Sequence, residues 1–401
     1  MNLNSTIRGG IILTFDTIFM FFFIVTIPLI YPIRSINKFF FRSHPISVWT
    51  GAPIITMKKK CMVERRLGFN SFSIINSPYS IEDKFDIIIQ NFSLRSRIIA
   101  TILRYIFFYI ICLTCTHVHS YCDGGLLPSK KERLYSFIEL YCYNLLGIKL
   151  LVWVYGGDVR TKKISESVGY PNCCTDCINV GEACICNVNL GDKNYQRVKK
   201  FATAVFSMGD MIAYTPGSIN DLFYWPIDLT DKIYSSNNIN SSNSKNKRII
   251  KIVHASNHGI FKGTRYLKEA VDQLKNSGYS IELQLISGIP NKELLKIFKQ
   301  SDIIFDQCLI GFHGYTAIEA MALHKPVLSY IRREDSIICP KECPIVRTTI
   351  STLKNDLEYL IKNQEFLISL GESGRKYVEK FYSLSAFENR LRKVYKELEL
   401  I

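Results

Sequence analysis

The feature that most constrains the fold is an alternation of short apolar runs with helical patterns, which occurs twice along the chain. In the first half, the apolar runs span 46–56, 71–75, 85–89, 113–119 and 150–158, and the helical patterns include 58–67 and 132–146. In the second half, the runs span 248–255, 281–287, 302–306 and 326–331, and the helical patterns span 264–277, 291–300 and 315–323. Strands that alternate with helices indicate parallel, doubly wound sheets. We therefore expect an α/β protein with two such sheets facing a cleft.

An Asn/Ser-rich tract separates the two alternations. Residues 235–247, SSNNINSSNSKNK, hold no core-forming residue except Ile239, so we expect a flexible linker there. The expected order is a hydrophobic membrane-anchor segment (1–42), a first domain (43–234), the linker, a second domain (248–384) and a C-terminal helix (385–401). The 401 residues are enough for two separate hydrophobic cores.

The N-terminal segment is apolar enough to interact with a membrane. Residues 11–33 are apolar apart from Asp16 and threonines, and as a helix they would reach about 34 Å, against a hydrocarbon core of about 30 Å. No small-x-small cleavage site follows, so we prefer a spanning or interfacial anchor to a cleaved signal peptide. Basic residues follow the segment at Arg34, Lys38 and Arg42. This bias places the body on the cytoplasmic face of the membrane, anchored or peripheral.

A second apolar stretch, 98–115, is interrupted by Arg104, and we expect a buried helix followed by a strand there. The formal net charge of +15 favours an anionic partner such as a nucleotide or an acidic membrane surface. No Arg-rich tract or zinc-finger spacing is present, so we do not expect a nucleic-acid partner.

Two loops of the second half carry groups suited to a nucleotide. HASNHGIFKGT (254–264) lies at the carboxyl end of a strand, where ligands bind in open α/β sheets. Gly263 allows close backbone approach, the next helix offers free N–H groups, and Lys262 adds a positive charge, a combination that suits a diphosphate. A polar loop with one solvated lysine is the alternative. In DQCLIGFHGYTAIEAMALHKPV (306–327), a glycine-spaced loop leads into an apolar helix that contains Glu319. This carboxylate is placed to bind ribose hydroxyls, or it is a surface or capping residue.

Together the two motifs resemble the donor half of the GT-B glycosyltransferases, in the retaining family 4 branch (glycosyl transferases group 1). The resemblance covers about 248–382 and extends more loosely to the first half. It implies two Rossmann-like domains, a nucleoside-diphosphate sugar as donor substrate, and no cofactor or divalent metal required for catalysis. The donor-binding residues that it implies are Asn257, His258, Lys262, Gly263, Gly311, Gly314, Tyr315 and Glu319. The family's usual acidic residue eight positions before Glu319 is Gly311 here, and Asp306 and Tyr315 are candidate substitutes.

The first domain is expected to supply the acceptor side through the loops that follow its strands. The residues assigned to it are Gly51, Pro53, His117, Gly124, Gly125, Gly156, Gly157 and Arg160. The HVH pattern places His117 and His119 on the same face of a strand, where one would contact the donor sugar or act as a base. The alternative is a pair of packed core histidines. The residues assigned to catalysis are Asp158, His119, Lys262 and Glu319.

Five cysteines lie in NCCTDCINVGEACIC (172–186). The pairs Cys174/Cys177 and Cys184/Cys186 have spacings compatible with a structural zinc site. A local disulfide and simple reduced thiols are the alternatives.

The leading functional hypothesis is a membrane-associated, hexosyltransferase-like enzyme of polysaccharide or glycolipid biosynthesis. Its partners would be a nucleotide-sugar donor, a glycan or lipid-linked acceptor and the membrane surface. A sugar-nucleotide epimerase and a degenerate, non-catalytic binding or regulatory subunit are the alternatives.

Overall fold

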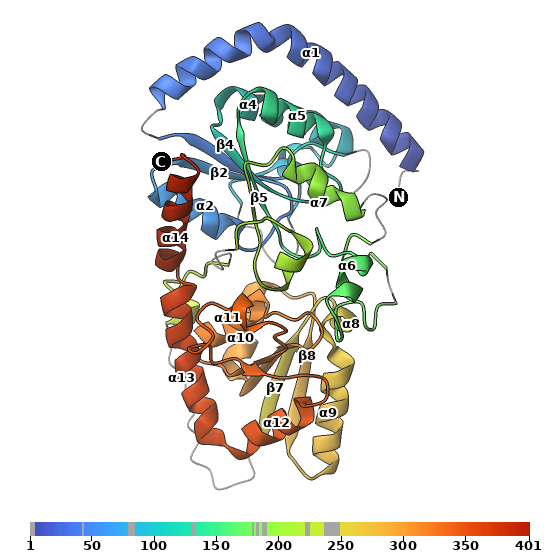
Figure 1. Ribbon diagram of the computed structural model, residues 1–401, viewed down its shortest axis with the longest axis vertical. Coiled ribbons are helices and arrows are strands. Elements are labelled where there is room, and N and C mark those ends of the chain that lie inside the picture. Colours follow the sequence, from blue (N-terminus) through green and yellow to red (C-terminus); the bar gives the residue numbers. More distant parts are fainter. Residues whose placement is uncertain are drawn as a thin grey trace.

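The computed structural model describes residues 5–41, 44–78, 85–129, 133–178, 180–181, 184–186, 191–220, 225–235 and 249–401. Its strands form two separate parallel sheets, one from each half of the chain, as expected (Figure 1). The expected linker at 235–247 lies outside the described residues except for Ser235.

The first sheet has six strands in the order β3-β2-β1-β4-β5-β6, and every neighbouring pair is parallel. Its strands are β1 (Ile46–Trp49), β2 (Asn70–Ile75), β3 (Ile87–Ile88), β4 (His117–Tyr121), β5 (Lys149–Trp153) and β6 (Ala204–Phe206). The helices that accompany it are α2 (Met57–Arg66), α3 (Ile89–Phe92), α4 (Arg97–Thr114), α5 (Phe137–Leu145), α6 (Lys162–Ser167) and α7 (Gly191–Lys199), with 3-10 turns η1 (Gly209–Tyr214) and η2 (Lys232–Tyr234). Strands β1, β4 and β5 are almost entirely buried because helices cover both sides of the sheet.

The second sheet has five parallel strands in the order β11-β10-β9-β7-β8. They are β7 (Ile250–Ala255), β8 (Ile281–Ile286), β9 (Ile303–Gln307), β10 (Val327–Ser329) and β11 (Val346–Arg347). Its helices are α8 (Gly259–Lys262), α9 (Thr264–Asn276), α10 (Asn291–Gln300), α11 (Tyr315–Ala322) and α12 (Leu353–Lys362), with the 3-10 turn η3 (Glu334–Ser336). The expected strands and helices of this half are present within a few residues of their predicted bounds.

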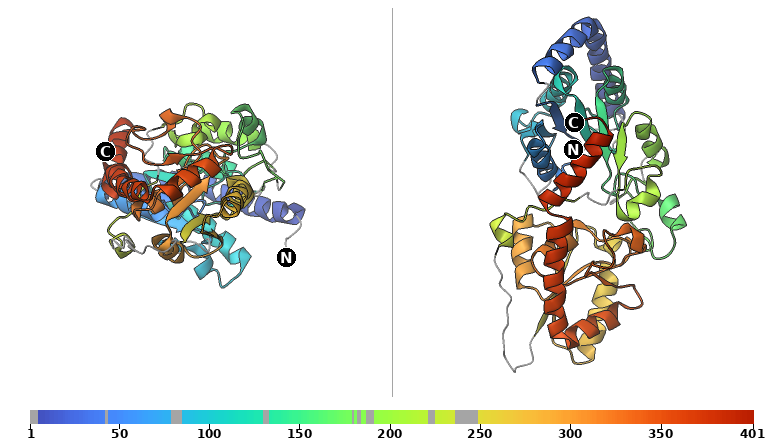
Figure 2. Two further views of the ribbon diagram at one scale, coloured as in Figure 1. Left: turned by 90° about the horizontal axis from the view of Figure 1, so that it is seen from below. Right: turned by 60° about the vertical axis from the view of Figure 1, so that its left-hand side comes forward.

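The last two helices connect the halves of the molecule. Helix α13 (Gln364–Phe381) packs on α11 of the second sheet, and α14 (Leu384–Glu397) packs on α2 of the first (Figure 2). The hydroxyl of Ser383 caps α14 by accepting a hydrogen bond from the Ala386 N–H at 3.2 Å. The C-terminal helix therefore belongs to the core of the first domain, although it follows the second domain in sequence.

Helix α1 (Ser5–Phe40) lies across α4 at the end of the first domain farthest from the second domain (Figure 1). Two buried polar side chains hold it there. The Tyr105 hydroxyl donates to Asp16 at 2.6 Å, and the Arg34 guanidinium donates to the Cys112 and Cys115 carbonyls at 2.6 and 3.1 Å. Among the described residues, α1 and α4 are the two helices long and apolar enough to cross a membrane by length and composition.

The prediction of a helix followed by a strand at 98–115 is wrong. Helix α4 runs unbroken from Arg97 to Thr114, and the strand begins only at His117. Arg104 does not interrupt the helix because its Nε donates to the Leu126 carbonyl at 2.5 Å and the side chain is only partly buried.

Candidate active site

The loops that follow the strands of the two sheets meet at the domain interface. Lys59, on α2 after β1, donates to the Tyr315 hydroxyl at the start of α11 at 2.9 Å. Arg332, after β10, donates to the Pro171 carbonyl in the segment after α6 at 2.9 Å. Both contacts join segments beyond the carboxyl ends of strands, so these ends face each other. This is the edge at which open α/β sheets bind ligands.

Lys262 and the loop before α11 form a charged site at this edge. The Lys262 ammonium lies 3.0 Å from the carboxylate of Asp306, which is fully buried at the end of β9, and the Lys262 side chain is 19% exposed. Asp306 also accepts the Gly314 N–H at 2.6 Å and the Ser329 hydroxyl at 3.2 Å. Burial opposes ionisation of Asp306, but Lys262 and the Gly314 N–H hold its pKa below its usual value.

The N-terminus of α11 opens directly beside this ion pair. A Cβ at Gly314, the N-cap residue, would lie 3.1 Å from Asp306 and 3.7 Å from the Lys262 ammonium, so the backbone passes close to both. The first N–H groups of a helix have no intrahelical acceptor and favour anions. Lys262 therefore lies beside the N-terminus of α11, whereas the sequence analysis paired it with the N-terminus of the helix that follows Gly263.

The remaining predicted donor residues have distinct placements. Gly263 has a φ of 82°, and a Cβ there would collide with the Cys308 thiol, so the turn into α9 requires glycine. The Asn257 side chain accepts the Gly288 N–H at 3.0 Å and joins the loops after β7 and β8. His258 lies farther along and lines a cavity shared with the cysteine-rich segment.

The structure shows what occupies the space beside Gly311. A Cβ at this residue would meet the guanidinium of Arg332 at 2.9 Å, and its φ is 91°. An acidic side chain does not fit without displacing Arg332. Sequence analysis missed Arg332, which places a second cation beside the Gly311–Gly314 loop.

Tyr315 is the first residue of α11, and Glu319 lies about one turn further along the helix. Glu319 is 3% exposed and accepts the side-chain N–H of Asn291, the first residue of α10, at 2.8 Å. The Tyr315 hydroxyl contacts Lys59 and donates to the Pro226 carbonyl at 3.3 Å, so it faces residues of the first domain. The sequence analysis also missed Lys59 and Asn291. Lys59 lies on the helix after a strand and Asn291 follows a loop, and no other feature of the sequence marked them as site residues.

On the side of the first sheet, the glycine loops pack tightly. A Cβ at Gly51, whose φ is 97°, would lie 2.5 Å from the Gly124 carbonyl oxygen, so the loops after β1 and β4 touch through backbone. A Cβ at Gly125 would collide with Glu139, which accepts the Leu126 and Leu127 N–H groups at 2.9 and 2.8 Å. Pro53 and Gly157 lie half-buried in the same loops.

Asp158 organises two of these loops from a buried position. Its carboxylate accepts the N–H groups of Cys122, Tyr155 and Gly156 at 3.2, 3.0 and 2.9 Å. Burial, and then the neighbouring Asp123, raise the pKa of Asp158 to about 7. With no exposed surface, Asp158 positions the loops and does not contact a substrate directly, which corrects its assignment to catalysis.

Asp123 is the neighbouring carboxylate, on a half-buried residue, and the sequence analysis did not select it. The Tyr155 hydroxyl donates to one carboxylate oxygen at 2.6 Å, and the other oxygen has no hydrogen-bond partner among the described residues. Burial raises the pKa of Asp123. Its position in the DGG sequence after β4 was the available signal.

The guanidinium of Arg160 makes its contacts within the protein. Its guanidinium makes a buried, bidentate pair with Asp210 at 2.8–3.0 Å, and a Cβ at Gly156 would collide with it. The guanidinium also lies 5.5 Å from the ring centroid of Phe261 on α8. Arg160 therefore braces the domain interface, and its predicted role in binding an acceptor is replaced by a structural one.

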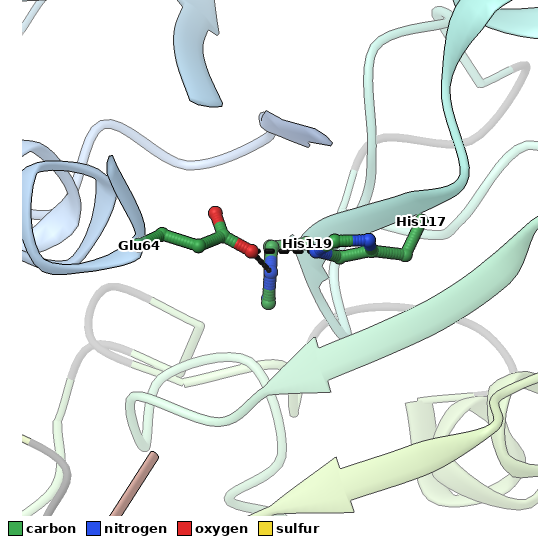
Figure 3. A group of neighbouring side chains, drawn as sticks. All are labelled: Glu64, His117 and His119. Carbon is green, nitrogen blue, oxygen red and sulfur yellow. Dashed lines mark hydrogen bonds and ion pairs between the residues drawn. The ribbon is translucent and has the colours of Figure 1, made fainter. Parts of the chain in front are cut away.

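His117 and His119 do not face the interface. Both are fully buried, and their Nε2 atoms lie 2.5 and 3.0 Å from the same oxygen of Glu64 on α2 (Figure 3). Tyr395, on α14, also contacts this group, at 2.7 Å from Glu64 and 2.9 Å from His119. The prediction that one of these histidines contacts a substrate is therefore corrected, because the cluster is an internal contact between β4, α2 and α14.

The hydrogen bonds of this cluster fix its protons. The Trp153 indole can only donate, and it lies 2.9 Å from His119 Nδ1, so this nitrogen accepts and the proton of the neutral ring is on Nε2. Burial lowers the pKa of His119 to about 4. Burial opposes the charge of Glu64, but its histidine partners hold its pKa well below normal. The carboxylate and two histidines have a composition that can bind a metal, but a protonated Nε2 directed at Glu64 makes them a hydrogen-bonded network.

The cysteine-rich segment, residues 171–186 as far as they are described, borders a cavity of about 540 Å³ at the domain interface. Its lining includes Cys173, Cys174, Cys177 and Cys184 from the first domain and His258 to Phe261 from the second. None of the thirteen cysteines of the chain forms a disulfide.

Comparison with known proteins places this architecture in a fold class. No protein-family model and no curated protein sequence matches the chain. Among solved structures, sucrose-phosphate synthase from Thermosynechococcus elongatus matches with a TM-score of 0.53 and 11% identity, over 89% of this chain and 99% of that chain. HepE from Anabaena, in complex with UDP and glucose, matches with a TM-score of 0.53 and 10% identity, over 88% of this chain and 100% of that chain. The fold is the GT-B glycosyltransferase fold.

Proposed function

We propose that the protein is a retaining glycosyltransferase of the family 4 type, which transfers a sugar from a nucleoside-diphosphate sugar to a glycan or lipid-linked acceptor. The observation that carries this proposal is the Lys262 ammonium, held by buried Asp306 beside the N-terminus of α11. An ammonium beside a helix N-terminus suits a diphosphate. Glu319, four residues along the same helix, would bind the ribose hydroxyls.

Chemistry at this site would depend on charge. Departure of the nucleoside diphosphate places negative charge on a phosphate oxygen, and donors already oriented there stabilise the transition state more than the ground state. Lys262 and α11 would supply this stabilisation, with Arg332 adding positive charge beside the loop. Because the protein itself supplies these cations, the scheme requires no divalent metal. Asp123, one oxygen of which is buried without a hydrogen-bond partner among the described residues, is the carboxylate that we assign to the acceptor side.

UDP-sugars are the first donors to test. HepE, which shares the fold, was crystallised with UDP and glucose. A purified preparation incubated with labelled UDP-glucose and a membrane extract should transfer label to a glycan or lipid fraction. Lys262→Met should abolish transfer, whereas Lys292→Met, which removes an exposed lysine on α10, should not. An epimerised free nucleotide sugar would indicate an epimerase, and binding without turnover would indicate a non-catalytic subunit.

We further propose that the protein lies on the cytoplasmic face of a membrane through α1 and α4. The outward faces of both helices are apolar, with Phe21 73%, Phe40 72% and Ile98 59% exposed. The hydrogen bonds of Asp16 and Arg34 hold α1 against α4 along its length, and a separate spanning helix would lose them. Helix α1 is therefore proposed to lie in the interface plane.

Flotation with anionic lipid vesicles tests this attachment. The double variant Phe21→Glu/Phe40→Glu should remain in the soluble fraction, and the wild type should float. Tyr359→Glu, at an exposed aromatic residue on α12, is the control and should float. Equal flotation of the double variant and the wild type would contradict the proposal.

The position of α1 also bears on the acceptor. The first sheet lies between α1 and the second domain (Figure 1). An acceptor sugar at the domain interface would therefore have to extend away from the bilayer, which favours a lipid carrying a glycan over a lipid headgroup alone.

A further inference from the structure

The guanidinium of Arg332 lies at the domain interface with part of its hydrogen-bonding capacity unused. One terminal nitrogen donates to the Pro171 carbonyl of the first domain at 2.9 Å. The Nε atom is buried and has no hydrogen-bond partner among the described residues. The acidic residues that follow it in the chain are paired with other arginines, Asp335 with Arg333 and Glu334 with Arg347. Leaving a buried N–H of a charged group unpaired is unfavourable, so this guanidinium calls for an acceptor from outside the chain.

The backbone fixes this guanidinium against the loop that precedes α11. The Arg332 N–H donates to the Gly311 carbonyl at 2.9 Å. The buried side-chain amide of Gln307 donates to the Phe312 and Tyr330 carbonyls at 3.1 and 2.7 Å, so it ties the same loop to the end of β10. A Cβ at Gly311 would lie 2.9 Å from the guanidinium carbon. The guanidinium therefore occupies the space that a side chain at position 311 would take.

A nucleotide sugar bound as in the proposed function, on which this step rests, would direct its sugar toward Arg332. With the ribose at Glu319, inside α11, and the diphosphate at the N-terminus of that helix, the sugar lies beyond the N-terminus, on the side of the preceding loop. Gly311 and Gly314 are three positions apart, a span of at most about 10 Å. The contact of Arg332 with the first domain also puts its guanidinium where an acceptor has to meet the sugar.

The chemistry of a guanidinium selects the kind of sugar. A guanidinium offers only N–H donors, whereas a sugar hydroxyl both donates and accepts and carries no charge. A carboxylate accepts two parallel N–H···O bonds from a guanidinium and compensates its charge. His313, the other polar side chain of the loop, is buried, and its Nε2 atom contacts the Tyr382 hydroxyl at 3.1 Å. Arg332 is therefore the group of this loop that can recognise a charged sugar.

From this arrangement we infer that Arg332 binds a carboxylate on the donor sugar, so that the donor is a nucleoside-diphosphate uronic acid. The Nε atom and one terminal nitrogen of the guanidinium would each donate to one carboxylate oxygen. UDP-glucose would keep the contacts of the diphosphate and the ribose and would remain a weaker donor. Arg332 would thus select the sugar, whereas Lys262 and Glu319 would hold the nucleotide.

Calorimetric titration of the full-length protein with matched pairs of ligands tests the inference. UDP-glucuronic acid is compared with UDP-glucose, and UDP-galacturonic acid with UDP-galactose, so that the members of each pair differ only at the sugar carbon that carries the carboxylate. In at least one pair the uronic acid should bind about 10- to 100-fold more tightly, as expected for hydrogen bonds between charged groups. UDP alone, measured on the same samples, reports the nucleotide site separately.

Two arginine variants assign the effect to one side chain. Arg332→Met should abolish the preference for the uronic acid and should weaken UDP binding much less. Arg333→Met removes the adjacent, 66% exposed arginine, which pairs with Asp335, and should retain the preference. Because both variants remove one positive charge, the pair also controls for the general attraction between an anionic ligand and a chain of net charge +15.

Two results would overturn the inference. One is wild-type protein that binds neither uronic acid more tightly than its matched hexose, a measurement that does not depend on whether a variant folds. The other is an Arg332→Met variant that loses as much affinity for UDP as for the uronic acid, which would place the guanidinium on the diphosphate. Wild-type protein that binds no UDP would contradict the proposed function itself. UDP binding without a preference for a uronic acid would contradict this inference alone.

Discussion

Substitution of Lys262 by methionine separates the structural and the ligand-binding roles of its ammonium. The change leaves the fully buried Asp306 carboxylate without its cation. Breaking a buried ion pair in this way costs about 3–5 kcal/mol. Here the Gly314 N–H and the Ser329 hydroxyl still solvate the carboxylate, and Lys262 is 19% exposed. We therefore expect a loss at or below the lower end of this range, about 2–3 kcal/mol, measured by urea denaturation.

The same variant should lose affinity for UDP. A hydrogen bond to a charged group contributes about 1.5–3 kcal/mol, which corresponds to a roughly 10- to 150-fold higher Kd at 1.4 kcal/mol per tenfold. In the double variant Lys262→Met/Asp306→Asn, the buried charge is gone, so stability should recover most of the loss while affinity stays low. Calorimetric titration of wild type and both variants provides the comparison. Lys262→Met that is destabilised but binds UDP as tightly as wild type would refute the diphosphate role.

Three further outcomes are expected. Tyr395→Phe, which removes the hydroxyl contacts to Glu64 and His119, should lower the free energy of unfolding by about 1–3 kcal/mol, against a negligible change for the exposed Tyr359→Phe. Because burial raises the pKa of Asp158 to about 7, the folded protein retains a proton that the unfolded chain releases near pH 4. The contribution of this group to the free energy of unfolding is thus present below about pH 4 and is lost as the pH rises to about 7. The free energy of unfolding, measured by denaturation at a series of pH values, should therefore fall over this interval, and Asp158→Asn should reduce the fall. Glu319→Gln should weaken UDP binding more than tenfold and 2′-deoxy-UDP binding less, and equal losses for both would contradict a ribose contact.

The second half of the chain was the more predictable from sequence. Its motifs lie on loops directly after strands, and parallel strands necessarily bring such loops to one edge. Lys262 and Gly314 therefore converged as expected. The residues that the sequence missed, Arg332 and Lys59, reach the site from the neighbouring strand and from the other domain, and such contacts depend on tertiary packing.

The first half was less predictable because its polar residues serve the interior. The HVH pattern gives two histidines on one face of a strand, but it does not reveal that Glu64 and Tyr395 enclose that face. Tyr395 is separated from His119 by most of the chain and reaches it only because α14 returns to the first domain. Similarly, Asp158 follows a glycine pair, which the sequence analysis interpreted as a turn at a binding site. In the structure, the Asp158 carboxylate accepts hydrogen bonds from the N–H groups of that same turn.

A crystal structure of the protein with UDP bound is the most direct test of the account. We predict that the diphosphate lies between the Lys262 ammonium and the first N–H groups of α11, with the ribose at Glu319. A nucleotide bound elsewhere, or no nucleotide at saturating concentration with Lys262 still paired to Asp306 alone, would contradict it.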